Sequence, residues 1–502
     1  MISPALRAAG LAALLCSVAP AALAQTVTTA QPAPSGVSQE QALSLAARLD
    51  ALERRNDELE AQVADLKAQV AAGQTAIREE VHAQPTVSLA NARPTFATPD
   101  GAFKIALRSL VQFDAAHYHV SPRRTDNDLG SGTDLRRVRF GFDGTAYKDW
   151  NFALWGEWGG SGGETPALNQ AYLEYAGWKP FAFADPMRLR IGAWATPTGL
   201  EDATSSTDSL FLERAAAAEL VRGLAGGDAR TGVGAFTKGE RWYASAVLTG
   251  KMVGVPATPE LSQQSGYILR AAFDPIHGQD YDAHLGVSYQ GILEPADTAL
   301  GPPEATAVRL QERPELRVSG TRLVDTGAIA SNGVQALGLE AGASWKTLYA
   351  AGEWFKIDVR RQFVGAAASP FDPSFSGWYL QGAWVPTGER RVWSSANGGF
   401  NGIRPGRPFS LKEGGWGALE LGARYSRLDL NDHAGVAGVA APLGGIRGGE
   451  QKISTVGLNW YPNSVVRFLL DYQWINVERL NAAGAHIDSD VNVVSLRSQF
   501  AF

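Results

Sequence analysis

The sequence predicts an all-β fold, a 16-stranded antiparallel transmembrane β-barrel, preceded by an N-terminal coiled-coil helix. The first observation is a hydrophobic alternation with a period of two residues, which begins near residue 100 and continues to the end of the chain. The second is segment length, because the alternating segments span about 9 to 15 residues, which suits tilted strands that cross a bilayer. The third is the alternation of short turns with long connections, which is typical of such barrels.

The composition excludes several other classes of protein. The chain of 502 residues is 45% hydrophobic and 19% charged, with 55 Gly, 14 Trp, 13 Tyr and 20 Phe. Its charged fraction is too low for an intrinsically disordered chain. After residue 24 there is no run of about 18 apolar residues, so no helix is expected to span a bilayer. If the chain is embedded in a membrane, it must therefore form a closed barrel.

Residues 1–24 are predicted to be a signal peptide. Arg7 is their one charged residue, an apolar run follows it, and the segment ends with the sequence Ala-Leu-Ala, which fits a cleavage site. The single cysteine, Cys16, lies inside this segment. The exported chain is thus expected to have no thiol, which excludes disulfides, thiolate catalysis and cysteine-ligated zinc.

Residues 25–37 are expected to be a flexible lead and residues 38–71 a coiled coil. The heptad core positions are Leu45, Leu49, Leu52, Asn56, Leu59, Val63, Leu66 and Val70. An amphipathic helix packed on a domain is the alternative, but the regular polar flanks favour self-association. A core Asn tends to favour two strands without fixing their number. Residues 72–99, which contain three prolines, are expected to be a linker.

Residues 100–502 are predicted to form the barrel. Val138 and Phe140 alternate with Arg137 and Arg139, so one face of this segment is apolar and the other is charged. In a soluble sandwich the apolar face would meet a second sheet, whereas in a barrel it would meet lipid and the charged face would meet a wet lumen. The long segments and the unequal connections favour the barrel, and about sixteen strands leave room for an aqueous channel.

The chain end and the order of the loops predict where the barrel lies. The last segment alternates and ends on Phe502, as outer-membrane barrels of Gram-negative bacteria do. An even number of strands places both chain ends on the periplasmic side, so the coiled coil is expected in the periplasm. One connection fits this poorly, because residues 387–415 would be a long periplasmic turn.

Several motifs resemble the phosphate-selective porin O/P family. They are LRRVRFGFDG at 135–144, YKDW at 147–150, AYLEY at 171–175, RLRIG at 188–192, LEDATSS at 200–206, FLER at 211–214 and GWGALELGARYS at 415–426. The resemblance implies a homotrimer of channels in outer-membrane lipid, each narrowed by its third outer loop, here residues 196–229. It also implies passive diffusion of small hydrophilic solutes, in particular inorganic anions such as phosphate or polyphosphate, with no cofactor and no nucleic acid partner.

The resemblance further implies a basic lumen wall and a narrowing loop. The wall arginines that share the lumen parity are Arg108, Arg137, Arg139, Arg188, Arg190, Arg270, Arg424, Arg467 and Arg497. The loop candidates are Asp202, Thr204, Ser205, Ser206, Glu213 and Arg214. Guanidinium groups offer forked donors to oxyanions, and a narrow pore of low dielectric constant strengthens each contact. The alternative for each wall arginine is a pair with a lumen Asp or Glu that stiffens the wall.

Two loop positions depart from the family pattern. Asp202 stands where the family has lysine, and Thr207 stands where the family has a basic residue. An acidic group at the narrowest point would repel phosphate, so a weakly selective general diffusion porin is the alternative function. Arg136 has the apolar parity, which places it at the membrane interface unless a bulge turns it toward the lumen. Glu213 and Arg214 are expected to anchor the loop.

Other function classes have less support in the sequence. A tether acting through residues 38–71 would link the outer membrane to another part of the envelope. An enzyme is not expected, because none of the seven His lies in a recognisable nucleophile motif. A metal site is not expected either: His117 and His119 share a strand face, but no third ligand is evident.

Overall fold

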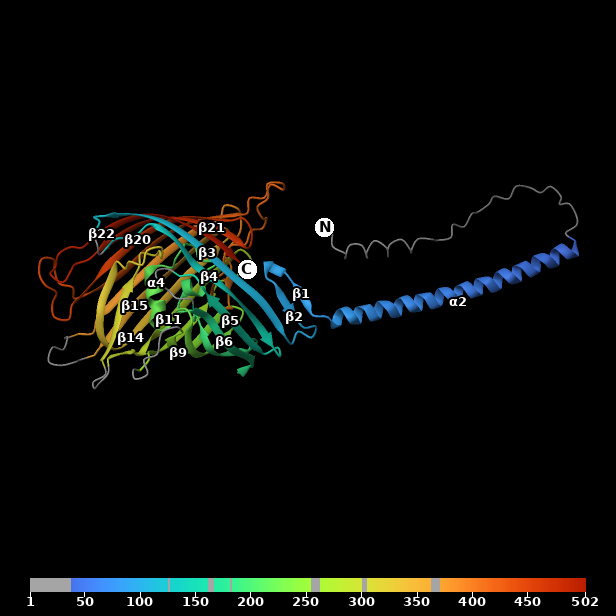
Figure 1. The fold of residues 1–502 in the computed structure, drawn as a ribbon, viewed down its shortest axis with the longest axis horizontal. Helices are drawn as coiled ribbons and strands as arrows, with labels where there is room; N and C mark the ends of the chain where they lie inside the picture. The colour runs from blue at the N-terminus through green and yellow to red at the C-terminus, as the bar shows by residue number, and fades with distance from the viewer. Residues whose placement is uncertain are drawn as a thin grey trace. The chain divides into compact units, whose positions relative to one another are not determined.

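The chain forms two compact units, Met1–Val81 and His82–Phe502 (Figure 1). The predicted signal peptide at 1–24, its Cys16 and the lead at 25–37 lie outside the described residues. No helix in the described part of the chain is both long and apolar enough to cross a membrane. The computed structural model describes residues 38–124, 127–160, 167–180, 183–253, 262–299, 305–362 and 371–502.

Sixteen long strands of the second unit close into a barrel. Each is antiparallel to the next, and the last pairs with the first, with Phe500 opposite Val111. The predicted 16-stranded antiparallel barrel is therefore confirmed. The strands are β3 Lys104–Ser121, β4 Gly132–Ala146, β5 Trp150–Glu157, β6 Ala167–Trp178, β7 Met187–Trp194, β8 Arg230–Lys238, β9 Trp242–Met252, β10 Ser265–Phe273, β11 Tyr281–Glu294, β14 Val324–Trp345, β15 Leu348–Arg361, β16 Ser374–Trp384, β19 Ala418–Asp432, β20 Ile446–Tyr461, β21 Val466–Glu478 and β22 Ser489–Ala501.

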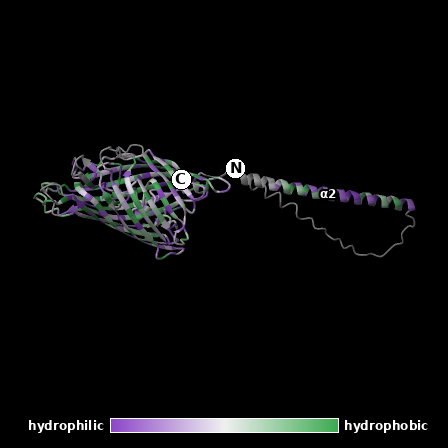
Figure 2. Ribbon diagram, turned by 90° about the horizontal axis from the view of Figure 1, so that it is seen from below, coloured by the Kyte–Doolittle hydropathy of each residue, from purple (hydrophilic) through white to green (hydrophobic). Residues whose placement is uncertain are grey.

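The two faces of the barrel wall have opposite character. On β11, Leu285 and Val287 are exposed on the outer face, whereas His284 and Ser288 are buried on the inner face. This alternation follows from the period of two residues in a strand, and Figure 2 shows apolar and polar residues alternating along the barrel strands. The outer face thus offers an apolar surface to lipid, and the inner face is polar.

The barrel has two unlike rims. One, here the short-turn rim, carries the turns at 147–149 and 462–465 and the chain end Phe502. The other, the long-loop rim, carries the connections at 295–323 and 433–445. This difference agrees with the unequal connections expected from the sequence.

The N-terminal segment differs from its predicted boundaries. Helix α2, Gln39–Ala83, continues past residue 71 and ends just before Pro85, which cannot continue a helix. The predicted linker at 72–99 is therefore wrong: its first part is helical, and strands β1 Thr86–Ser88 and β2 Thr95–Ala97 follow the helix. Strand β2 pairs with β3 and so belongs to the barrel unit. The heptad side chains of α2 are exposed in the single chain, and their self-association stays a prediction.

Three connections fold into the barrel. Loop 196–229 contains the short helices α3 Leu200–Ala203 and α4 Ala216–Ala225, and the apolar face of α4 packs on wall residues such as Val334 and Phe355. The connection at 295–323, on the long-loop rim, contains β12 Asp297–Ala299 and β13 Ala305–Glu312. Connection 387–415 contains β17 Trp393–Ser394 and β18 Gly399–Phe400 and packs against loop 196–229. The connection that fitted poorly as a turn is thus an inward plug.

A charge in the middle of the outer face is expected to weaken the barrel. Leu285 lies midway between the exposed Tyr281 and Tyr289 on β11, so it marks the centre of the lipid-facing band. Leu285→Arg should lower the free energy of unfolding in lipid vesicles by about 2–4 kcal/mol. Urea unfolding followed by tryptophan fluorescence measures this loss. Leu443→Arg, in an outer loop, is the control, and an equal loss in both variants would contradict a lipid-facing position for Leu285.

Candidate functional site

The lumen holds two cavities that meet at a ring of charged residues. The cavity at the short-turn rim has a volume of about 760 Å³, and the cavity toward the long-loop rim has about 710 Å³. Both are lined by Arg137, Arg139, Arg222 and Asp228, which we call the neck. Two of these residues come from β4 and two from loop 196–229. The wall and the loop therefore both line the solute path at the neck.

Ion pairs around Asp228 hold the neck in place. Arg222 Nη2 lies 2.5 Å from Asp228 Oδ1, and Arg139 Nη2 lies 3.1 Å from Oδ2. Arg139 also pairs with Glu157 of β5. With Arg137, three guanidinium groups face one carboxylate at the neck itself. The neck is thus basic but not uniformly so.

Asp202 is a buried member of the loop network. Its Oδ1 lies 2.6 Å from Arg222 Nε and 3.2 Å from Arg214 Nη2. Its Oδ2 accepts hydrogen bonds from the backbone N–H and the hydroxyl of Thr198, at 3.1 and 3.2 Å. Two guanidinium groups therefore compensate its charge. The strong repulsion of anions expected from the sequence does not follow from this geometry.

The loop hydroxyls predicted for the constriction lie along the cavity at the short-turn rim. Ser205 and Ser206 line it together with Thr204 and Thr207. The Thr204 hydroxyl donates to the carbonyl of Leu200 at 3.3 Å, which leaves its hydrogen committed inside the loop. Ser205 is exposed, and its hydroxyl lies 2.9 Å from that of Thr207. This pair offers hydroxyl groups to a solute in the cavity.

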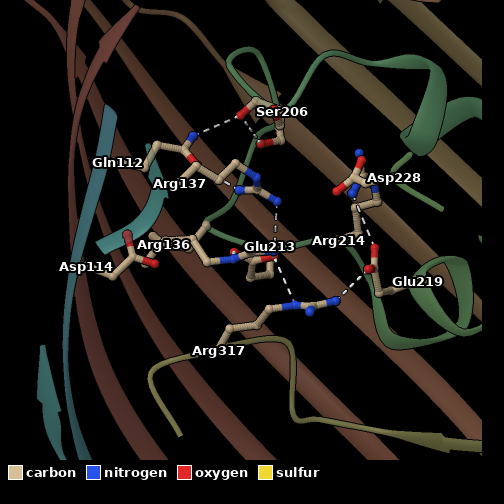
Figure 3. A network of polar contacts seen from close by, with 12 residues as sticks. Gln112, Asp114, Arg136, Arg137, Ser206, Glu213, Arg214, Glu219, Asp228 and Arg317 are labelled. Carbon is tan, nitrogen blue, oxygen red and sulfur yellow. Dashed lines mark hydrogen bonds and ion pairs between the residues drawn. The ribbon is translucent and has the colours of Figure 1, made fainter. Parts of the chain in front are cut away.

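Glu213 forms ion pairs between the loop and the wall, whereas Arg214, the other residue expected to anchor the loop, pairs with Asp202 and Glu219 of the loop itself. Glu213 Oε1 lies 2.8 Å from Arg136 Nε and 2.8 Å from Arg497 Nη2, and its Oε2 lies 3.7 Å from Arg137 and Arg317 (Figure 3). Burial opposes ionisation of Glu213, but the arginines outweigh burial and hold its pKa well below the ordinary value. The anchor therefore stays charged at neutral and mildly acidic pH.

A bulge in the wall makes this anchor possible. The pairing of β3 with β4 skips a step between Gln112 and Asp114, which turns Arg136 inward although its parity is apolar. Arg136 and Arg137 are both buried on the lumen side as a result. The structure therefore places Arg136 in the lumen and not at the interface, the position that its parity alone indicates.

Several wall arginines expected to face solute hold the inward segments instead. Arg424 lies 2.5 Å from Glu315 and 3.0 Å from Glu201. Arg467 donates to the carbonyls of residues 207 and 209 at 3.1 and 2.7 Å. Arg270 and Arg497 pair with two buried carboxylates of the wall, Glu340 and Asp114. For these four, a structural pair, the alternative to solute contact, describes the geometry, and of the four only Arg467 also lines the cavity at the short-turn rim.

The remaining wall arginines keep a position by the lumen. Arg108, whose side chain is 42% exposed, and the neck residues Arg137 and Arg139 line the cavity at the short-turn rim. Arg190 pairs with Glu174 at 2.6 Å and lies over Tyr172. The Arg188 guanidinium donates to the carbonyl of residue 396 at 3.4 Å, in the inward plug. Solute contact by each remains a prediction.

Sequence reasoning missed two of the four neck residues. Arg222 lies in α4, within the apolar run AAAELVRGLA, and Asp228 follows that helix. A single arginine in an apolar helical stretch requires a buried partner, and this was the available signal. Its partners come from the loop itself, so strand parity on the wall gave no information about them.

One group of described residues has the spacing of metal ligands. Asp274, His277 and Asp282 bring ligand atoms within 4.8 Å of one another. His277 Nδ1 already lies 2.9 Å from Asp274 and 2.8 Å from Asp282, and Arg390 lies 2.6 Å from Asp282. The backbone N–H of Trp393 also donates to Asp282 at 3.0 Å. The group therefore fastens the inward plug to the wall.

A closed sixteen-stranded barrel with a charged lumen narrowed by an inward loop defines an outer-membrane porin, a channel and not an enzyme. The chain belongs to the family of phosphate-selective porins O and P, whose model matches residues 103–502.

Two curated relatives are similar over most of the chain. Porin O of Pseudomonas aeruginosa is 26% identical over 425 residues, which cover 80% of this chain and 90% of the relative. An uncharacterized protein of Caulobacter vibrioides is 25% identical over 416 residues, which cover 79% of this chain and 76% of the relative.

Solved structures with a similar fold are more distant. The outer-membrane channel DcaP of Acinetobacter baumannii is 10% identical with a TM-score of 0.46, covering 80% of this chain and 98% of that one. The anion-selective porin from Comamonas acidovorans is 14% identical with a TM-score of 0.45, covering 80% of this chain and 100% of that one.

Removing the charge of Glu213 is expected to release the loop. Glu213→Gln leaves Arg136 without its counter-charge in a buried site, whereas Arg497 keeps Asp114, and the change should cost about 3–5 kcal/mol of unfolding free energy. The open-channel current should become noisier because loop 196–229 gains mobility. Urea unfolding and single-channel recording measure the two effects.

The control for this variant is Glu478→Gln, which removes an exposed carboxylate that lies 3.0 Å from Lys452. An exposed pair contributes at most about 1 kcal/mol, so this variant should behave like the wild type. Equal stability losses in the two variants would show that Glu213 does not anchor the loop.

Glu201 gives the channel a predicted pH dependence. It accepts a hydrogen bond from the backbone N–H of Ala215 at 2.9 Å and lies 3.0 Å from Arg424. Burial raises its pKa to about 7, although Arg424 opposes the rise. Because the folded pKa lies above the ordinary value of 4.5, the folded chain takes up a proton as the pH falls through 7, and folding stability increases in that direction.

The loss of this negative charge should raise the preference for anions by about two-fold between pH 8 and pH 6. Reversal potentials in chloride gradients measure the preference, and chloride is used because phosphate itself titrates in this range. Glu201→Gln should reduce this pH step, and the remainder belongs to other buried carboxyl groups such as Glu312, whose pKa burial also raises to about 7. A pH step of unchanged size in this variant would assign the titration to another group.

Proposed function

We propose that this porin lets small anions diffuse passively across the outer membrane, with phosphate and related oxyanions as the preferred solutes. The observation that carries the proposal is the charge of the cavity at the short-turn rim. Its lining contains three aspartates, Asp202, Asp208 and Asp228. It also contains eight arginines, namely Arg93, Arg108, Arg137, Arg139, Arg214, Arg222, Arg404 and Arg467.

The arrangement suits an oxyanion on chemical grounds. A guanidinium group presents two parallel N–H donors, which match two oxygens of a phosphate. In a narrow pore with little water these contacts replace part of the hydration shell of the anion. The hydroxyls of Ser205 and Thr207 add neutral donors beside the arginines. Asp228 and Glu157 offset part of the positive charge at the neck, so an anion binds there weakly enough to leave again.

The comparisons give further support for phosphate. The matching family is described as phosphate-selective, and one relative is named Porin O. The compensated charge of Asp202 removes the main sequence argument for the alternative, a weakly selective general diffusion porin. An envelope tether acting through residues 38–71 is compatible with both the phosphate-preferring channel and the weakly selective channel.

We further propose a homotrimer with the coiled coil in the periplasm. The support is the row of exposed heptad residues along α2, from Leu45 to Val70, which would leave water on self-association. In this arrangement the short-turn rim faces the periplasm and the long-loop rim faces the cell exterior.

Ion selectivity tests the proposed function directly. In planar bilayers with a KCl gradient, the wild type should show a reversal potential of the sign that indicates anion preference, and added phosphate should reduce the chloride current. Arg139→Gln removes a neck charge and should lower the anion-to-cation permeability ratio about five-fold. Asp202→Asn should raise the ratio, because Arg214 and Arg222 each keep another acidic partner.

Arg123→Gln is the matched control, since Arg123 forms an exposed pair with Asp128 and lines neither cavity. It should leave the reversal potential unchanged. Cation preference in the wild type would refute the proposed function, and anion preference without any effect of phosphate would favour the weakly selective alternative.

A further inference from the structure

The chain segment before the barrel contributes a residue to the channel lumen. Arg93 lies between β1 and β2, and β2 pairs with the first barrel strand. The backbone of Leu107 holds the segment in place, because its N–H donates to the carbonyl of Pro94 at 2.9 Å and its carbonyl accepts from Arg93 Nε at 3.1 Å. Arg93 then lines the cavity at the short-turn rim.

Arg93 shares one carboxylate with a wall arginine. Its Nη2 contacts Asp143 Oδ1, and Arg108 Nε lies 2.6 Å from the same oxygen. The side chains of Arg93 and Arg108 are 26% and 42% exposed, so both are accessible from the cavity. One carboxylate compensates one of the two positive charges. The trio formed by Arg93, Arg108 and Asp143 therefore keeps about one net positive charge next to the solute path.

The trio also keeps hydrogen-bond donors free. Among the described residues, Arg93 Nη1 and both Nη groups of Arg108 have no hydrogen-bond partner. The Arg108 guanidinium lies over the ring of Trp155 at 4.7 Å, which fixes its plane without using its N–H groups. Free N–H groups on two adjacent guanidiniums are the donors that an oxyanion needs.

We propose that Arg93 and Arg108 form an oxyanion-binding site at the short-turn rim, to which the segment outside the barrel contributes one of the two arginines. The inference rests on the proposed passage of anions and adds a second binding site to the neck. An anion that leaves the neck passes from Arg139 to this site within the same cavity. Two sites in series let an anion move in short steps, and neither site has to bind strongly.

Sided block by inorganic phosphate tests the site in the full-length channel. Phosphate is added to either side of a planar bilayer while the chloride current is recorded. Arg93→Gln should raise the half-blocking phosphate concentration from the short-turn side about three-fold, whereas Arg93→Lys, which keeps the charge, should stay close to the wild type. Arg241→Gln is the control, because Arg241 lies at the same rim, donates to a backbone carbonyl and does not line the cavity.

A cysteine variant compares the two signs of charge at position 93 in one folded channel. Arg93→Cys is labelled in the open channel with methanethiosulfonate reagents from one side, and the unlabelled wild type, whose exported chain is expected to have no thiol, is the control. A positively charged reagent should restore phosphate block toward the wild-type value, and a negatively charged reagent should weaken it further. Labelling from the short-turn side only is expected.

The possible outcomes separate the site from the proposed function. If the wild type prefers anions and Arg93→Gln blocks like the wild type, the site is refuted and the proposed function stands. If Arg93→Lys loses as much block as Arg93→Gln, or if reagents of both charges act alike, the effect is structural and the site is also refuted. If the wild type has no preference for anions, the proposed function itself fails.

Discussion

The pairing of guanidinium groups with carboxylates inside the barrel is the interaction on which the rest of the structure depends. A charged group moved out of water is costly unless an opposite charge and good hydrogen bonds meet it. Glu213 meets Arg136 and Arg497, and Glu201 and Glu315 meet Arg424. The contacts of Glu213 and Glu201 join strands at opposite ends of the chain to loop 196–229 and fix where it lies, and Glu315 joins connection 295–323 to the same arginine, Arg424.

The position of the loop divides the lumen into two unlike halves. The apolar face of α4 packs against the wall formed by strands such as β14 and β15, where Val334 and Phe355 receive it. The charged side of the loop is left opposite β4, where Arg137 and Arg139 lie. Hydrophobic packing on one side therefore sets the width and the charge of the path on the other side.

The same residue type has two tasks in this lumen, and burial separates them. Arg424, Arg467 and Arg497 are almost fully buried and hold carboxylates or backbone carbonyls. Arg93 and Arg108 are partly exposed and keep free N–H groups. A buried arginine that holds carboxylates or carbonyls of the protein stabilises the loop, and a partly exposed one with free donors is available to a passing anion.

The sequence by itself determined the strands, their inner and outer faces and the family, because alternation and local motifs are properties of short segments. It also indicated the inward loop through its motif at 200–206. It did not determine which arginines reach the solute, the inward turn of Arg136, or the helix and strands within 72–99. Those depend on contacts between distant residues, such as Arg424 with Glu201, and only the folded chain brings these together.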